Sequence, residues 1–350
     1  MIPAFVLTGF LGSGKTTLLR QWLARPELSR TAVIINEFGE VGLDHDLVEA
    51  GEESFVQLQT GCLCCTIRGD LSLTLDDLLR RREAGSVPRF ERIVIETSGL
   101  ADPAPILQSL MADASTAEQV ALAQVVTTVD AVNAEHTLRH HKESMKQIAV
   151  ADRLILTKTD LLGSAPEALI SRLRAINPVA PVLVSERGLI DPAQVLDGSA
   201  WDLATKTLDV QRWLGEPPRD HAHSHAHDAN RHSSSIGCYA IVRSEPVPAV
   251  ALTLFLEALA DHCGADLLRL KGIVNVAESP ERPAVVHGVQ HVFHPPAWLP
   301  RWPSQDHSTR LVFIVREVPR EWMDKLLAAI EAEVCDVSAT GPSGGRDASR

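Results

Sequence analysis

Three cysteines lie within four positions of the segment TGCLCCTIRGD, and the whole chain holds only six. Their thiolates form a ligand set that suits a soft or borderline metal such as Zn²⁺. No second cysteine pair follows at the spacing of a structural zinc site, so Cys62, Cys64 and Cys65 leave one coordination position for exchange. Water, a histidine, Glu37 or Glu40 would complete the set. Buried apolar cysteines, or a redox pair at Cys64 and Cys65, are the other interpretations.

A phosphate-binding motif precedes the cysteines. The segment GFLGSGKT fits the pattern G-x-x-x-x-G-K-[ST], follows an apolar strand-like run and opens a helix-like one. Its glycines allow backbone N–H groups to close around phosphate oxygens, its lysine adds positive charge over the β and γ phosphates, and its threonine offers a hydroxyl to Mg²⁺. A glycine-rich turn that binds nothing is the alternative. The expected contacts come from Gly9, Gly12, Gly14, Lys15 and Thr16.

Two later strand-like runs end in residues that suit the same site. RIVIETSG ends in Glu96, expected near the magnesium ion, and Gly99, whose N–H is expected to reach the γ-phosphate. A simple strand-to-loop junction is the alternative. LILTKTD supplies Lys158 and Asp160, and this aspartate can accept two hydrogen bonds from guanine that adenine cannot donate. Thr157 stands where GTPases usually carry asparagine, and a hydroxyl does only part of what an amide does.

An ATPase with an incidental K-x-D sequence is therefore the alternative to a GTPase. The segment VSERG, with Ser185, offers a weak candidate for a loop that closes over the base. The residues expected to act in hydrolysis are Lys15, Thr16 and Glu96, with GTP and Mg²⁺ as the expected ligands.

Elements that alternate along the first two hundred residues must position these groups. Apolar runs such as TAVIIN, SFVQLQTG and PVLVSE predict buried strands of a parallel sheet, and segments such as KTTLLRQWLARPE predict helices between them. This alternation predicts an α/β fold of the P-loop NTPase type, with a doubly wound, mostly parallel sheet. SFVQLQTG is expected to bring the cysteines to the rim where the strands end and nucleotide binds. A change set by the γ-phosphate would then reshape the metal site.

The composition changes near residue 215. We expect residues 1–215 to form the nucleotide domain and residues 216–235 a linker rich in proline and histidine. Four strand-like runs and two helix candidates then predict a small α+β domain over 236–336, followed by a disordered tail over 337–350.

The linker carries alternating histidines. In a flexible segment, neutral imidazoles chelate Zn²⁺, Co²⁺ or Ni²⁺ loosely, which would suit metal capture. A solvated linker that binds metal only incidentally is the alternative. The histidines in question are His221, His223, His225 and His227.

Bulk properties exclude several classes of protein. The net charge of −12 argues against a protein that grips nucleic acid through phosphates. We expect no signal peptide, no membrane span and no disulfide framework, and therefore a cytoplasmic protein with reduced thiols. The scattered cysteines Cys238, Cys263 and Cys335 are interpreted as packing residues.

With the P-loop, NEFGEVGLD, GCLCC, ETSGLADP and TKTD in that order, the sequence resembles the CobW family of P-loop GTPases over nearly its whole length. The second domain looks like the CobW C-terminal domain. The resemblance implies that phosphates and Mg²⁺ are bound by Gly12–Thr17, with Ser13 and Thr17 among them. It assigns guanine to Lys158 and Asp160, and the metal to the three clustered cysteines.

The resemblance implies a metallochaperone that moves zinc from the C-x-C-C motif to client metalloproteins with GTP hydrolysis. Co²⁺ and Ni²⁺ stay open as cargo. The client is unidentified, and a homo-oligomer stays open. One rival hypothesis is an insertion factor for cobalt in cobalamin synthesis or for a nitrile hydratase centre. Another is a module that stores or senses zinc and binds nucleotide without turnover.

Overall fold

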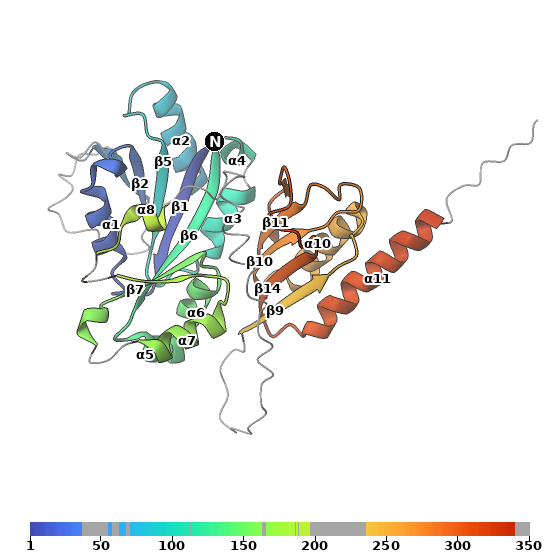
Figure 1. Ribbon diagram of the computed structural model, residues 1–350. Coiled ribbons are helices and arrows are strands. Elements are labelled where there is room, and N and C mark those ends of the chain that lie inside the picture. The colour runs from blue at the N-terminus through green and yellow to red at the C-terminus, as the bar shows by residue number, and fades with distance from the viewer. Residues whose placement is uncertain are drawn as a thin grey trace, which may run out of the picture. The chain divides into compact units, whose positions relative to one another are not determined.

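The structure is a computed structural model whose described residues divide into two compact units, Met1–Cys238 and Tyr239–Arg350 (Figure 1). The division falls within strand β9, and each unit is treated by itself. The described residues are 1–36, 55–57, 63–67, 71–112, 114–162, 166–185, 187, 189–196 and 236–339.

The first unit alternates strands and helices, as the sequence pattern predicts. Its described elements, in chain order, are β1 (Ile2–Gly9), α1 (Lys15–Leu23), η1 (Pro26–Leu28), β2 (Thr31–Asn36), β3 (Phe55–Gln57), β4 (Leu63–Ile67), α2 (Leu71–Glu83), β5 (Arg92–Thr97), α3 (Ala104–Ala112), α4 (Ala114–Gln119), β6 (Val120–Asp130), α5 (Ala134–His140), α6 (Lys142–Ala149), β7 (Arg153–Thr157), η3 (Thr159–Leu161), α7 (Glu167–Ile176), β8 (Val182–Val184) and α8 (Pro192–Val195).

These strands form one eight-stranded sheet in the order β3-β4-β2-β5-β1-β6-β7-β8. The neighbours from β4 to β8 are parallel, so the predicted doubly wound, mostly parallel sheet is confirmed. The register brings the carboxyl ends of the central strands together, with Gly9 beside Thr128 and Asp130 beside Thr157. The phosphate motif and the TKTD segment therefore leave the sheet at the same rim, as nucleotide sites of this fold require.

Helices cover both faces of the sheet. On one face, Phe5 and Leu7 of β1 pack in a cluster with Leu18 and Trp22 of α1 and Val195 of α8. Figure 1 shows α3 and α6 on the other side of the sheet from α1, and these helices pack against β6 and β1. Because both faces are covered, β6 and β7 are buried along their whole length, which explains why their sequences are mostly apolar without a polar residue at every second position.

The expected strand SFVQLQTG differs from its prediction. Its described part, β3, is antiparallel to β4 and stands at the edge of the sheet. The reason lies in the chain length between the two strands, residues 58–62, since a parallel crossover needs a dozen residues or more. The cysteine segment itself forms β4, a strand that the sequence analysis did not predict.

The second unit contains an antiparallel sheet with strand order β12-β11-β10-β14-β9, and β13 pairs with β11. This arrangement confirms the predicted smaller α+β domain. Its elements are β9 (Ile236–Arg243), α10 (Ala249–Cys263), β10 (Leu267–Val274), β11 (Ala284–Val289), β12 (Val292–Phe293), β13 (Ala297–Trp298), β14 (Thr309–Arg316) and α11 (Arg320–Ala339).

One core fills the second unit. Phe255 of α10 meets Phe313 of β14 edge-to-face, with ring centroids 6.3 Å apart, and Met323 and Leu327 of α11 join the same cluster. Helix α11 continues to Ala339, beyond the end at residue 336 that the sequence analysis gives this domain. In the part of the chain that the structure describes, no helix combines the length and the apolar character needed to cross a bilayer.

Candidate nucleotide site

The phosphate loop is held tightly against the neighbouring strand. A Cβ on Gly9 would lie 2.4 Å from the carbonyl oxygen of Thr128, and Gly9 adopts a φ of +139°. Only glycine fits this position, because a side chain would collide with backbone. Ser13 N–H donates to the Phe10 carbonyl at 3.1 Å, which closes the turn, and Ser13 Oγ lies 2.6 Å from Thr128 Oγ1. The loop therefore has a fixed shape before any ligand enters.

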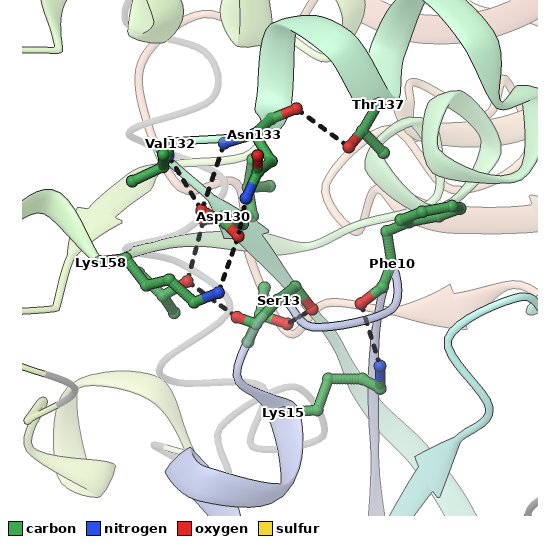
Figure 2. Close-up of polar contacts among 11 residues, drawn as sticks. Phe10, Ser13, Lys15, Asp130, Val132, Asn133, Thr137 and Lys158 are labelled. Carbon is green, nitrogen blue, oxygen red and sulfur yellow. Dashed lines mark hydrogen bonds and ion pairs between the residues drawn. The ribbon is translucent and has the colours of Figure 1, made fainter. Parts of the chain in front are cut away.

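Lys15 lies over this loop at the start of α1. Its Nζ donates to the carbonyl oxygens of Gly9 at 2.8 Å and Phe10 at 3.2 Å, and the residue is only 8% exposed. Figure 2 shows the side chain reaching back toward Phe10. The ammonium group is thus held beside the loop, where the phosphates of a nucleotide are expected. The expected contacts Gly12 and Gly14 complete the loop, and Thr17 is exposed in the first turn of α1.

Thr16 and Glu96 face each other across the strand ends. Thr16 Oγ1 donates to Glu96 Oε1 at 2.6 Å, and Glu96 is buried at the carboxyl end of β5. A hydroxyl and a carboxylate form an all-oxygen donor set, which suits Mg²⁺. These two predicted residues, 80 positions apart, are therefore brought together in a pair that fits the metal.

Thr157 ties the phosphate loop to the TKTD segment. Its Oγ1 donates to the Ser13 carbonyl at 2.8 Å and also lies 3.2 Å from the Val129 carbonyl. At the position where GTPases usually carry asparagine, this hydroxyl thus tethers the phosphate loop, since a single donor suffices for the contact. The departure from the usual sequence thus has a structural account.

Lys158 pairs with an acid that the sequence analysis did not single out. Its Nζ donates to Asp130 Oδ2 at 2.8 Å, and Asp130 also accepts from Val132 N–H at 2.9 Å and from Asn133 Nδ2 at 2.9 Å (Figure 2). Burial would raise the pKa of Asp130, but these hydrogen bonds and the charge of Lys158 hold that pKa below its ordinary value. The signal was available, because the strand QVVTTVD ends in an acid at the nucleotide rim.

The two candidate base-binding loops are also joined. Asp160 is exposed in η3, and the adjacent Thr159 Oγ1 donates to the carbonyl oxygen of Ser185 at 3.3 Å. Lys158 adopts a left-handed φ of 58° just before η3, which turns the chain out of β7. Asp160 and Ser185 therefore follow neighbouring parallel strands, β7 and β8, at one rim.

A cleft of about 290 Å³ opens beside the phosphate loop. Phe10, Ser13, Asp130 and Lys158 line it together with residues of α5 and α6. The ring of Phe10 contacts the ring of His141 at the start of α6, with centroids 4.5 Å apart and the planes tilted by 37°. The loop is thus supported by a helix on its outer side.

The cysteine segment differs from its expected place at the rim. Cys64 and Cys65 belong to β4, where their backbones pair with Val33 and Ile34 of β2. The rim lies further on, where Asn36 ends β2. The run LCCTI is compatible with a strand because it is mostly apolar and ends in two β-branched residues, Thr66 and Ile67.

Most of the expected metal ligands fall outside the described residues. In the described ranges, no three histidine, cysteine or acidic residues gather closely enough to hold a metal ion. The expected ligands that lie outside these ranges are Cys62, Glu37, Glu40, His221, His223, His225 and His227.

The scattered cysteines only partly behave as predicted. Cys263 is buried in the core of the second unit and Cys238 is half-buried, whereas Cys335 is exposed on α11. Cys335 is therefore not a packing residue, because its helix position faces solvent.

The fold and this rim define the class of protein, a P-loop GTPase. Residues 3–184 match the family model described as CobW/HypB/UreG, nucleotide-binding domain, and residues 236–331 match the cobalamin synthesis protein cobW C-terminal domain. The chain therefore belongs to the CobW/HypB/UreG family, and the resemblance predicted from its motifs is confirmed.

Proteins with named functions resemble the chain over most of its length. The zinc chaperone YjiA of Escherichia coli (strain K12) is 34% identical over 320 residues, which cover 91% of this chain and 96% of YjiA. A zinc chaperone CobW of Sinorhizobium sp is 29% identical over 309 residues, covering 80% of this chain and 83% of that protein.

A solved structure supports the same relationship. The crystal structure of Zn(II)-bound YjiA GTPase from E. coli aligns with a TM-score of 0.73 and 30% identity, covering 94% of this chain and 98% of that one.

A third relative by sequence matches a smaller part of the chain. The zinc-regulated GTPase metalloprotein activator 1 of Schizosaccharomyces pombe is 36% identical over 209 residues, which cover 57% of this chain and 50% of that protein.

Proposed function

We propose that this chain is a GTP-hydrolysing metallochaperone that binds zinc at its C-x-C-C segment and passes it to client metalloproteins. The observation that carries the proposal is the position of the cysteine strand relative to the nucleotide rim. Strand β4 pairs with β2, which pairs with β5, so Cys65, Ile34 and Ile95 form one row across the sheet. Ile95 directly precedes Glu96. Two strand spacings of this kind span roughly 10 Å.

This proximity gives a route for coupling cargo to nucleotide. A change in β2 would act on both the cysteine strand and the strand of Glu96, since β2 lies between them. The names of the relatives point to the same cargo, because YjiA and CobW are called zinc chaperones and a Zn(II)-bound YjiA has been crystallised. The reduced thiols that such a site needs fit a cytoplasmic protein.

Hydrolysis would use the residues gathered at the rim. Mg²⁺, bound by Thr16 and Glu96 together with the phosphates, would neutralise the negative charge that develops during phosphoryl transfer. Lys15 would move from the carbonyls of its own loop to the β and γ phosphates. Lys158 and Asp160 would hold guanine. Turnover is expected to be slow without a partner, and contact with an unidentified client metalloprotein is expected to stimulate it.

A zinc titration of the reduced protein against a chromophoric chelator tests the proposal. It is run with GDP and with a nonhydrolysable GTP analogue, each with Mg²⁺, and is repeated on Cys64→Ala. We expect one tight site whose affinity differs between the two nucleotides and which disappears in the variant. Tight binding that survives Cys64→Ala, or equal affinities with both nucleotides, would contradict a nucleotide-controlled cargo site at the cysteines.

A further inference from the structure

Helix α6 holds the loop that follows Glu96. Gln147 Nε2 donates to the carbonyl oxygens of Gly99 at 3.2 Å and Ala101 at 3.1 Å. The preceding residue, Lys146, forms an ion pair of 2.6 Å with Asp102 Oδ2. Two adjacent residues of one helix thus bind three of the four residues from Gly99 to Asp102. Helix α6 therefore anchors this loop through two backbone carbonyls and one carboxylate.

Gln147 is well placed to act as a fixed donor. The side chain is 1% exposed, and its own backbone carbonyl accepts a hydrogen bond of 2.8 Å from Thr127 Oγ1 of β6. The helix is therefore tied to the central sheet at the residue that holds the loop. A buried amide that gives both N–H groups to backbone carbonyls determines how those peptide groups are oriented.

The loop from Gly99 to Asp102 packs closely against the phosphate loop. A Cβ on Gly99 would approach the backbone nitrogen of Leu11 to 2.7 Å, so the two backbones are in direct contact. The same helix supports the phosphate loop, because the ring of His141 at its N-terminus contacts the ring of Phe10. Helix α6 therefore contacts both loops that would surround the terminal phosphate of a nucleotide.

We propose that Gln147 is a positioning residue for GTP hydrolysis, which holds the Gly99 and Ala101 carbonyls and so fixes the loop whose Gly99 N–H is to meet the γ-phosphate. That N–H belongs to the Ser98–Gly99 peptide group, and the Ser98 carbonyl accepts from the N–H of the anchored Ala101 at 3.1 Å. The inference rests on the proposed GTPase site and adds to it a residue outside the sequence motifs. Loss of this anchor would affect the state with a γ-phosphate and leave the GDP state largely unchanged, because GDP lacks the phosphate that the Gly99 N–H is expected to reach.

A matched pair of isosteric variants tests the role. Gln147→Glu replaces the donating amide by oxygen that faces two carbonyls. Asn177→Asp makes the same change at the C-terminus of α6, directly after Gln147, where Nδ2 of Asn177 donates to the carbonyls of Ile148, Ala149 and Ala151 at 2.8, 3.2 and 2.9 Å. Both variants disturb buried amide contacts of one helix, and only the first touches the Gly99 loop.

The measurements are kcat for GTP and the ratio of affinities for a nonhydrolysable GTP analogue and for GDP, both in the full chain. We expect Gln147→Glu to lose roughly tenfold or more in kcat and a similar factor in the ratio, since small misplacements of reacting groups cost this much. Asn177→Asp is expected to lower Tm and to leave the ratio within about twofold of the wild type.

An unchanged ratio in Gln147→Glu, or an equal change in Asn177→Asp, would overturn the positioning role. If Gln147→Glu does not fold, Gln147→Leu removes the same donors without adding charge, and the same comparison applies. A wild-type chain that binds both nucleotides without turnover would contradict hydrolysis itself, whereas the affinity ratio would still decide the role of Gln147.

Discussion

The ammonium group of Lys158 and the carboxylate of Asp130 form an ion pair of 2.8 Å across the ends of two neighbouring parallel strands. Asp130 is the last residue of β6, and Lys158 directly follows β7. Hydrogen bonds from Val132 and Asn133 fix the carboxylate from the other side. The lysine of the guanine-binding segment is thus oriented by the neighbouring strand before a base is bound.

Asp130→Asn is expected to weaken binding of guanine nucleotides. The variant keeps the size of the side chain and removes its charge, so Lys158 loses its ionic partner. Because the Lys158 side chain is 37% exposed, we expect a loss of only roughly three- to tenfold in GDP affinity. Fluorescent GDP titration measures it. Asp152→Asn is the control, because Asp152 accepts from Val125 N–H, away from the phosphate loop. Equal losses in both variants would contradict the assignment.

The same pair predicts how stability depends on pH. Hydrogen bonds and the Lys158 charge outweigh burial and hold the pKa of Asp130 below its ordinary 3.8. A carboxyl whose pKa is lower in the folded state stabilises the fold above its ordinary pKa, and this contribution is lost as pH falls through the folded pKa. The difference in unfolding free energy between the wild type and Asp130→Asn should stay constant above about pH 5 and shrink below 3.8. Denaturant unfolding at several pH values measures it.

Part of this site is predictable from sequence because the signal is local. The spacing of Gly9, Lys15 and Thr16 and the run that ends in Glu96 specify a loop and a strand end by themselves. The fold then brings Thr16 and Glu96 together because parallel strands end at one rim. Local motifs and one rule of topology were sufficient for these residues.

Other contacts depend on how strands pair and helices pack in the folded protein, which cannot be predicted from a single sequence. Asp130 looks like an ordinary strand end until β6 and β7 pair. Gln147 lies within a helix and has no motif around it, so its contacts with Gly99 and Ala101 appear only when α6 packs on the sheet. Strand β4 was missed because five residues of mixed character carry too weak a periodic signal.

Thr157→Val should loosen the phosphate loop. The Thr157 hydroxyl serves the carbonyls of Ser13 and Val129, and the residue is 4% exposed. Valine keeps the shape and leaves both carbonyls without this donor, which costs about 1–3 kcal/mol in unfolding free energy. Thr157→Ser keeps the hydroxyl and is the control. Denaturant unfolding, with GDP affinity measured in parallel, distinguishes the two variants. A serine variant that loses as much unfolding free energy as the valine variant would contradict the role of the hydroxyl as a tether.

Glu96→Gln should impair the response to Mg²⁺. Glutamine can still accept from Thr16 Oγ1, but it lacks the charge that favours a divalent cation. We expect kcat to fall by about a hundredfold and the Mg²⁺ concentration for half-maximal GTPase rate to rise. Glu91→Gln is the matched control, since Glu91 is exposed and precedes the opposite end of β5. A normal Mg²⁺ profile in Glu96→Gln would remove this carboxylate from the metal site.

Cysteine reactivity should distinguish the three scattered thiols, those of Cys238, Cys263 and Cys335. Burial raises the pKa of Cys238 to about 12, and burial together with the charge of Asp266 raises the pKa of Cys263 to about 11. At pH 8 only about one Cys263 in a thousand would be a thiolate, which is the reactive form. Cys335 is exposed on α11. Alkylation with iodoacetamide, followed by peptide mass spectrometry, should modify Cys335 first and reach the other two only after unfolding.

The control for this experiment is Cys335→Ser, which should abolish the fast modification on α11 and leave the peptides of Cys238 and Cys263 unmodified in the native protein. Peptide mapping keeps these thiols distinct from the clustered cysteines of residues 62–65, whose reaction is followed separately with and without zinc. Modification of Cys263 as fast as that of Cys335 would mean that α10 opens readily, because Cys263 donates to the Leu259 carbonyl inside the packed core.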